Sequence, residues 1–452
     1  MPKQIGKWIR VLVVFLVFYC FILGLLLAVG LPSQYVDAMK FLKEGLILIL
    51  VFLAALCARR FENRGFNLLD WLVLSLWLVC TIYLLRFSPA QVPNVAKLNE
   101  YRIYIYVCIA YWIGRYSSIS PDEMIRLVKF ISFIALVSAI VSVLNLAVFD
   151  YAFSNIADLY RMNHTFSAEY GNDVLSLQGL EQTWGGGFYL RIWDLNGSYL
   201  DLGNYLVFAS CSFLCFFYFS RRRKYLYLSI VCMIILLLTG ARAAAATMLL
   251  IGLGVVAVRL KKPFLAFGIL GIGVVVVATV QTVQDAFVMA VGNALDLSDR
   301  AGHIGGWYFM IQSFIANPYG YGFGVGERTA SIFGTSRYLT GFDSNPAHFI
   351  GNMGFLGGAL WLATEIVLLI TVNRVRKSDP RIDVRIVAFA AFFIGLNYFL
   401  ISLTKYIDTS YDVAFPFWIL VGWVSARSNF IWNPEGSMVV TRDVVTIPQF
   451  GK

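Results

Sequence analysis

The most regular feature of the chain is a series of long, continuously apolar stretches separated by short polar segments. A typical stretch is VLVVFLVFYCFILGLLLAVGL at residues 11–31. A run of about 20 apolar residues is long enough for a helix to cross a bilayer, whereas the strands of a membrane barrel alternate apolar and polar residues. The pattern therefore predicts an all-α polytopic membrane protein in which helices are the spanning elements.

The apolar runs define about twelve transmembrane helices, each about 14–23 residues long. We place them near 11–31, 41–57, 69–85, 101–114, 127–148, 199–219, 225–239, 243–259, 263–283, 351–373, 386–404 and 412–426. The chain then divides into N-terminal helices 1–5 (1–148), a periplasmic loop (149–198), helices 6–9 (199–283), a large periplasmic loop with an amphipathic helix (284–350), and helices 10–12 with a cytoplasmic tail (351–452).

The distribution of charge predicts the orientation of these helices. The net charge of +10 would fit an anionic partner such as nucleic acid, but basic residues also accumulate in loops that face the cytoplasm. With the N-terminus inside, most of the 36 basic residues fall on the inner side, for example at 221–224 and 374–385. We therefore expect both termini in the cytoplasm, and the charge requires no nucleic acid.

Neither the first apolar run nor the cysteines indicate a chemical function. The basic start MPKQIGKWIR precedes a run too long for a signal peptide and without a small-residue cleavage site, which indicates a retained first span. All seven cysteines fall inside apolar runs, where cysteine packs as a small hydrophobic residue. This placement suggests no disulfide, zinc or redox site.

Two outer loops, 149–198 and 284–350, are much longer than a connection between helices requires, and function is expected there. They contain all three histidines, His164, His303 and His348. The spans are almost free of charge in their centres, because Glu44, Asp201 and Asp412 lie near predicted ends. A substrate site at the bilayer midplane, which an ion-coupled transporter usually needs, is therefore not indicated.

Two arginines stand beside small residues at the outer membrane surface. Arg191 follows the glycine run 185–187, whose flexibility would let the guanidinium reach a phosphate headgroup; an interfacial arginine beside Trp193 explains it equally well. Arg242 lies in the turn TGARAAAA at 239–246, a crowded place where an arginine needs an anionic partner. That partner is either a ligand or an acidic residue of a neighbouring loop.

The segment 298–316 has the spacing of an amphipathic helix on the outer interface, capped by Ser298. Arg300, His303 and Trp307 would share one face of it, although a surface helix with an interfacial arginine explains the same pattern. The following stretch, NPYGYGFGVG at 317–326, alternates glycines, which excludes regular structure and permits close backbone approach to a ligand.

The fourth cluster, Asp343-Ser344-Asn345-Pro346-Ala347-His348, precedes MGFLGGALWL at the start of the tenth span. A histidine on the aqueous side titrates near neutrality and can take a proton from a hydroxyl, but a lone histidine is more often a hydrogen-bonded cap. No serine, cysteine or aspartate stands in a recognisable nucleophile motif, and no acidic cluster resembles a catalytic metal site. We therefore expect neither a metal nor a cofactor.

Together, the four clusters occur in an order that resembles the bacterial O-antigen polymerase and O-antigen ligase superfamily over roughly 185–370. That order is an arginine before a mid-chain span, a small-residue turn with Arg242, an outer loop with R…W…NP-x-G-x-G-x-G, and a polar start to MGFLGGALWL. The ligases have a His-Asn pair where Asp343-Ser344 stands here, and this difference favours a polymerase.

The resemblance implies an inverting glycosyl transfer at the periplasmic face of the bacterial inner membrane, with undecaprenyl-diphosphate-linked oligosaccharides as donor and acceptor. His348, Arg242 and Arg300 would be catalytic, and Arg191, Asp343, His303 and Trp307 would bind the diphosphate and glycan. Arginines can take up the charge of a diphosphate leaving group without a metal ion. A chain-length regulator protein is a further expected partner; a ligase, or a polysaccharide or lipid-linked sugar transporter, is the alternative function.

Overall fold

The structure is a computed structural model, and most of it is α-helical. It describes residues 2–32, 35–36, 39, 41–58, 65–148, 181–184, 187–190, 199–239, 241, 244–245, 247–248, 251, 310–312, 314–325, 344–403, 411–428, 430–432 and 438–440. Two short antiparallel hairpins accompany the helices in these ranges.

The helices are α1 (Pro2–Val17), α2 (Tyr19–Ala28), α4 (Leu42–Ala58), α5 (Leu68–Ile82), the π-helical turn η2 (Tyr83–Phe87), α6 (Asn94–Tyr116), α7 (Pro121–Ala147), α9 (Tyr199–Ser220), α10 (Arg223–Thr239), α16 (Asn345–Ser378), α17 (Ile382–Ser402) and α18 (Tyr411–Ser425). The hairpins pair β1 (Glu181–Trp184) with β2 (Gly187–Leu190), and β3 (Phe430–Trp432) with β4 (Met438–Val440).

All but two of the predicted spans coincide with these helices. The exceptions, 243–259 and 263–283, lie largely outside the described residues. Four helices begin about two turns before the predicted spans: α1 at Pro2, α6 at Asn94, α7 at Pro121 and α16 at Asn345, instead of residues 11, 101, 127 and 351. These extensions include polar residues, which hydropathy alone excludes from a span.

Within the described ranges, five helices are long and apolar enough to cross a membrane: Leu68–Phe87, Pro121–Asn145, Leu202–Ser220, Asn345–Ser378 and Ile382–Ser402. A sixth is obtained if α1 and α2, which are bent by 62° relative to each other, form one broken span. Helix α18 is apolar but shorter. The chain is therefore an α-helical, multi-pass membrane protein, while the full number of spans stays a prediction.

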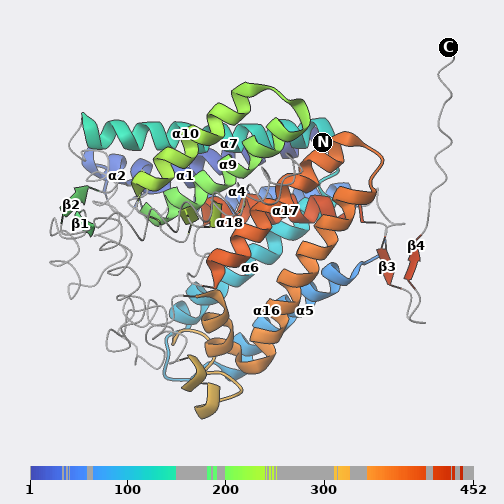
Figure 1. Ribbon diagram of the computed structural model, residues 1–452. Helices are drawn as coiled ribbons and strands as arrows, with labels where there is room; N and C mark the ends of the chain where they lie inside the picture. Colours follow the sequence, from blue (N-terminus) through green and yellow to red (C-terminus); the bar gives the residue numbers. More distant parts are fainter. Residues whose placement is uncertain are drawn as a thin grey trace, which may run out of the picture.

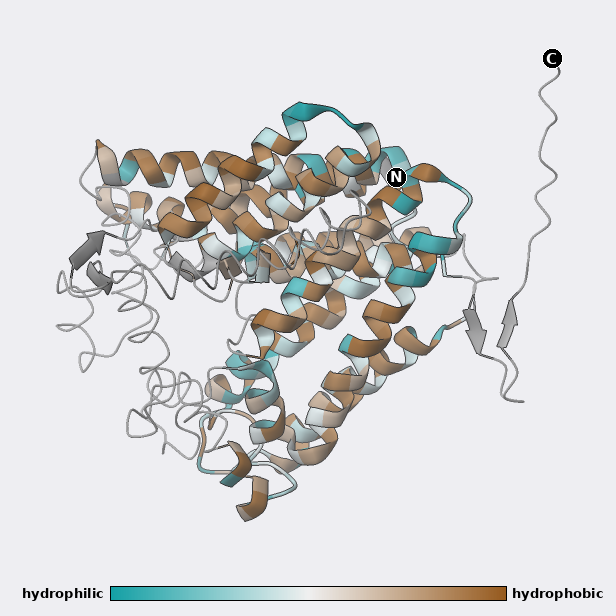
Figure 2. Cartoon of the chain, viewed as in Figure 1, coloured by the Kyte–Doolittle hydropathy of each residue, from teal (hydrophilic) through white to brown (hydrophobic). Residues whose placement is uncertain are grey.

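The outward faces of the helices support the same conclusion. Large apolar side chains on several helices are exposed, for example Leu48 and Phe52 on α4, Leu237 on α10 and Phe355 on α16. Figure 2 shows the apolar residues along the helices and the polar residues mainly at their ends and turns. Contiguous exposed apolar surface of this kind is expected where lipid is the solvent.

Local sequence signals explain where several helices begin. Asn67 caps α5 by accepting a hydrogen bond from the Asp70 backbone, and the Asp70 side chain accepts one from Asn67 N in return. Ser120 caps α7 ahead of Pro121, and Ser344 caps α16. Each cap satisfies backbone N–H groups that have no partner inside the helix.

The helices pack in two groups that diverge toward one end of the molecule (Figure 1). Helices α9, α10 and α7 lie together, and α16 packs against α17 and α5. Helices α6 and α18 pack most closely, because a Cβ at Gly114 would collide with the Ile419 backbone and one at Gly422 with the Tyr111 backbone. Small residues commonly allow such close crossings in membrane proteins.

Segments that the charge pattern predicts to be cytoplasmic contact one another at one end of the bundle. Arg10 of α1 donates to Glu123 of α7. Lys129 lies 5.1 Å from the ring centre of Phe216, near the end of α9, and the end of α16 packs on the start of α17 through Arg376 and Phe389. The segments predicted to be cytoplasmic therefore lie at the same end of the helices. The side of the membrane that this end faces stays a prediction.

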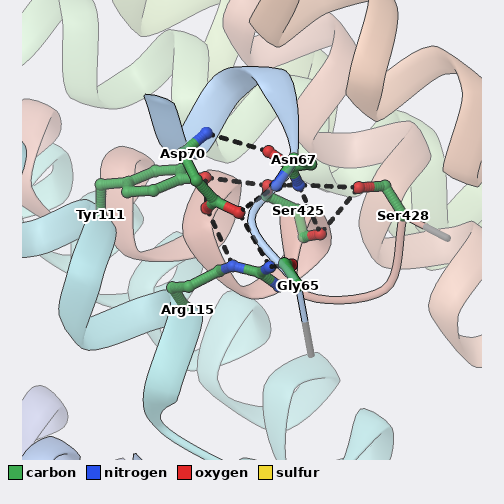
Figure 3. Close-up of polar contacts among 7 residues, drawn as sticks. All are labelled: Gly65, Asn67, Asp70, Tyr111, Arg115, Ser425 and Ser428. Atoms are coloured by element: carbon green, nitrogen blue, oxygen red, sulfur yellow. Dashed lines mark hydrogen bonds and ion pairs between the residues drawn. The ribbon is translucent and has the colours of Figure 1, made fainter. Parts of the chain in front are cut away.

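A buried polar network ties three helices together at this end of the bundle (Figure 3). Arg115, near the end of α6, donates to both Asp70 oxygens at 2.8 and 2.9 Å. Tyr111 also donates to Asp70, and Asn67 donates to the Ser425 hydroxyl of α18 at 2.7 Å. Because the charged pair is almost completely buried, its hydrogen bonds must compensate for the lost hydration.

One sequence-based expectation about the spans is wrong. Glu365 lies within α16, deep in the predicted tenth span, and only 1% of its surface is exposed. The expectation of almost charge-free span centres therefore does not hold for α16. By contrast, the six cysteines whose surroundings are described are all buried, as expected for small apolar side chains.

Candidate functional site

At the opposite end of the bundle, residues 317–325 fold against residues 351–355 of α16, and we call these two segments the clasp. Backbone hydrogen bonds join them: Tyr321 N to Gly351 O at 2.8 Å, Gly322 N to Asn352 O at 2.9 Å, and Phe355 N to Pro318 O at 3.0 Å. The bonds are possible because α16 is interrupted at Gly354, which has non-helical angles of φ 61° and ψ −153°. The clasp fixes the first turns of α16 to the preceding loop.

The alternating glycines serve this contact. Gly320, Gly322, Gly324 and Gly354 all have positive φ, a conformation that other residues adopt only with strain. A Cβ at Gly320 would lie 2.5 Å from Gly354 N, and one at Gly322 would lie 2.6 Å from Phe87 O. The sequence predicted close backbone approach to a ligand here; in the structure the close approach is to the protein's own backbone.

A buried carboxylate anchors the clasp to α6. Glu100, 2% exposed, accepts a hydrogen bond from Gly324 N and another from the Asn352 side chain at 2.8 Å. The same Asn352 amide donates to the Tyr104 hydroxyl at 2.8 Å. Three segments far apart in the sequence therefore meet at Glu100, and its hydrogen bonds offset the cost of burying a charge.

His348 is the predicted catalytic residue that the structure describes. It lies in the first turn of α16, two turns before the Gly354 break, and is partly buried. Its backbone N–H bonds to Ser344 O at 3.1 Å. His348 is thus part of a capped helix start next to the clasp.

The other predicted site residues lie outside the described residues: Arg191, Arg242, Arg300, His303, Trp307 and Asp343. Their predicted roles are therefore neither supported nor contradicted by contacts. The last turns of the predicted amphipathic helix are partly described, and residues 310–312 and 314–316 are helical. Met310 there packs with Val92, Ala96 and Ala347, which joins this helix to α6 and α16.

A second group of polar residues, which we call the Glu44 cluster, joins the starts of α4 and α18 to the first half of α6. It consists of Lys43, Glu44, Arg102, Tyr106 and Tyr411. Glu44 Oε1 accepts from the Tyr106 hydroxyl at 2.8 Å and from Arg102 Nη1 at 3.2 Å. The ammonium of Lys43 lies 4.7 Å from the ring centre of Tyr19 and 5.5 Å from that of Tyr411.

Helix α6 holds both constellations on different faces. Glu100 and Tyr104, four residues apart, face the clasp, whereas Arg102 and Tyr106, also four apart, face Glu44. Residues at this spacing lie on one face of a helix, and a shift of two residues turns to the opposite side. The first half of α6 therefore contacts the clasp on one side and the Glu44 cluster on the other.

Sequence reasoning missed Glu44, Glu100 and Arg102 as candidates. Glu44 was noted only as lying near a span end, Glu100 falls in the connection just before the predicted span 101–114, and Arg102 falls at the start of that span. One local signal was present, because Glu100, Arg102, Tyr104 and Tyr106 place polar atoms at every second position where an apolar run begins. Their partners, Asn352 and Glu44, are 252 and 62 positions away, so pairing could not be read locally.

Comparisons with known proteins add no further identification. No model of a known protein family matches the chain, and no curated protein matches it.

Proposed function

We propose that the chain is a polysaccharide polymerase of the O-antigen type, an inverting glycosyltransferase that joins undecaprenyl-diphosphate-linked repeat units at the periplasmic face of the bacterial inner membrane. The observation that supports it best is the clasp. It unites the glycine motif at 317–325 with the start of MGFLGGALWL, beside His348. These are two of the four elements whose order carries the resemblance, and a shared site requires them to be adjacent.

The proposed reaction uses residues of the outer end. His348 orients the acceptor sugar hydroxyl from its fixed position on α16. Arg191, Arg242 and Arg300 hold the donor diphosphate, where planar guanidinium groups make paired hydrogen bonds to phosphate oxygens. They stabilise the charge that develops on the leaving group, so the reaction proceeds without a metal ion.

The proposed orientation rests on the positive-inside pattern. The basic segments cluster at the end that contains Arg10, Arg115 and Arg376, which becomes the cytoplasmic side. His348, the clasp and the Glu44 cluster lie at the other helix ends and therefore face the periplasm, where lipid-linked repeat units are joined in this family.

Reconstitution of the purified protein tests the proposal directly. Proteoliposomes supplied with lipid-linked repeat units, extracted from a strain that lacks the gene, should form polymers of two or more repeats. The same result is expected in the presence of EDTA, because no step uses a metal. Failure of the active, correctly folded protein to join repeats would reject the proposal.

A transporter of lipid-linked sugars is the second candidate, favoured by Glu365. An ionisable residue buried in a spanning helix often marks an ion or substrate pathway. Transport would require Glu365 for movement of the lipid-linked unit across the membrane and not for joining repeats. Accumulation of inward-facing lipid-linked units in a Glu365→Gln strain would favour the transporter over the polymerase.

A further inference from the structure

Two strongly basic segments lie at the same end of the helices, and we call them the basic segments. The first, residues 221–224, spans the connection from α9 to α10 and reads Arg-Arg-Arg-Lys. The second, residues 374–385, spans the connection from α16 to α17 and holds five basic residues. All four cations of the first segment are exposed, and so are Lys377, Arg381 and Arg385 of the second. Figure 2 shows hydrophilic residues at both connections, next to apolar helices.

Aromatic packing brings the two basic segments together. Phe389, two turns into α17, stacks on Tyr218 with ring centres 5.0 Å apart and meets Phe219 edge-to-face at 5.5 Å. Tyr218 and Phe219 belong to the last turn of α9. Arg376, in the last turn of α16, has its guanidinium carbon 5.2 Å from the same Phe389 ring centre. Because α9 and α16 both end at one ring of α17, the basic segments that follow these ends lie side by side.

The acidic residues of the basic segments balance little of this charge. The two segments hold nine basic residues but only Asp379 and Asp383 as acids. Asp379 already accepts hydrogen bonds from the side chain and the backbone N–H of Arg381. Exposed cations within a Debye length of about 8 Å repel one another, and this repulsion opposes the packing of α9 on α17. An anionic partner at this surface would remove the repulsion.

The position of the basic segments favours a lipid over a soluble anion as this partner. They adjoin the ends of three helices that are long and apolar enough to cross a membrane, Leu202–Ser220, Asn345–Ser378 and Ile382–Ser402. Large apolar side chains close to the cations are exposed, with Tyr227 59% and Ile382 58% exposed. A phospholipid uses both kinds of surface, because its phosphate binds the cations and its acyl chains cover the apolar side chains. A soluble phosphate would leave the apolar side chains uncovered.

We propose that the two basic segments together form a binding surface for phospholipids with a net negative headgroup, and that these lipids stabilise the packing of α9 on α17. Seven of the nine cations are arginines, whose planar guanidinium groups donate paired hydrogen bonds to phosphate oxygens. The inference does not depend on the proposed glycosyl transfer, because it concerns helix packing and includes no residue of the proposed reaction.

The test measures the thermal midpoint of unfolding of the purified, detergent-solubilised protein while phosphatidylglycerol is added. Phosphatidylcholine, which has no net charge, and inorganic phosphate are added in parallel experiments. We expect phosphatidylglycerol alone to raise the midpoint by several degrees, because a ligand that binds only the folded state stabilises it. NaCl at about 1 M should abolish the rise, since the Debye length falls to about 3 Å. An equal rise with phosphatidylcholine or with inorganic phosphate, or a rise that resists salt, would overturn the inference.

Two double variants locate the surface. Arg222→Gln/Arg223→Gln removes two exposed cations of the first basic segment. The control, Arg86→Gln/Lys97→Gln, removes two cations near the clasp, at the other end of the helices. Each cation near an acidic lipid surface contributes about fivefold to binding, so the first variant should need about 10- to 30-fold more phosphatidylglycerol for half of the rise.

We expect the control variant to respond to phosphatidylglycerol as the wild-type protein does. A wild-type response of Arg222→Gln/Arg223→Gln, or equal losses in both double variants, would overturn the inference. Should Arg222→Gln/Arg223→Gln fail to fold, the salt and phosphatidylcholine experiments on the wild-type protein decide, because they need no substitution.

Discussion

The Asn352 side chain donates a hydrogen bond of 2.8 Å to Glu100 Oε1, and this contact joins the start of α16 to α6 across 252 positions of sequence. The same amide donates to Tyr104, so one side chain bridges the clasp and α6. Replacing Asn352 by alanine leaves a buried carboxylate with fewer donors.

We expect Asn352→Ala to lower the free energy of unfolding by about 1–3 kcal/mol, the usual cost of leaving a buried polar group without its partner. Thermal unfolding of the detergent-solubilised protein measures it. Asn373→Ala is the control, because Asn373 accepts a hydrogen bond from Arg376 of its own helix and so does not bridge two helices through it. Equal midpoints for both variants would show that the bridge does not stabilise the protein.

The clasp glycines give a second prediction, in which strain and collision can be separated. Gly320 has φ +83° and its Cβ would collide with Gly354, whereas Gly30 has φ +85° with no atom within 4 Å. Gly30→Ala should cost only the strain of positive φ, about 1–2 kcal/mol. Gly320→Ala should cost more and reduce polymer formation. If Gly30→Ala and Gly320→Ala lost the same stability, the collision at Gly320 would cost no free energy, and the prediction would be wrong.

Mutations in the buried Asp70–Arg115 network should lower the stability of the protein and leave the proposed reaction unaffected. Arg115→Leu leaves Asp70 charged and enclosed, and we expect it to destabilise the protein by about 3–5 kcal/mol. The double variant Asp70→Leu/Arg115→Leu should recover part of that loss, because it removes both charges. A thermal unfolding series on the three proteins tests this, and a double variant less stable than Arg115→Leu would contradict it.

The arginines predicted to bind the diphosphate give a prediction of their own. Arg242→Lys and Arg300→Lys keep the charge but lose the planar pair of donors, so each should lower the rate by about 30- to 1000-fold, or about 2–4 kcal/mol. Arg337→Lys, in the same long loop as Arg300 but outside its motif, is the control. Full-length polymer from the first two variants would refute the assignment, and equal damage from all three would reduce it to a general effect on the loops.

The helices were predictable because lipid makes the apolar pattern continuous: α4, α7, α9 and α17 begin and end within a few residues of the predicted spans, apart from the first turns of α7. Helix starts within polar sequence were harder to predict. Ser344 caps α16, which begins at Asn345, and the helix is interrupted at Gly354, whose non-helical angles cannot be predicted from hydropathy.

The candidate site was predictable only where one segment carried the signal. The glycine motif and His348 stand out in the sequence, and the structure places them at the same end of α16. Glu44 and Arg102 do not stand out, because an isolated charge near a span end is common. Their significance comes from pairing across helices, which is decided by packing and not by local pattern.

The length distribution of the surface glycan after deletion of the gene tests the central claim most directly. The account predicts lipid A–core carrying a single repeat unit, with long polymer restored by the wild-type gene. Unchanged long polymer in the deletion strain would contradict any role in polymerisation. Lipid A–core without any repeat unit would contradict the polymerase and indicate a ligase.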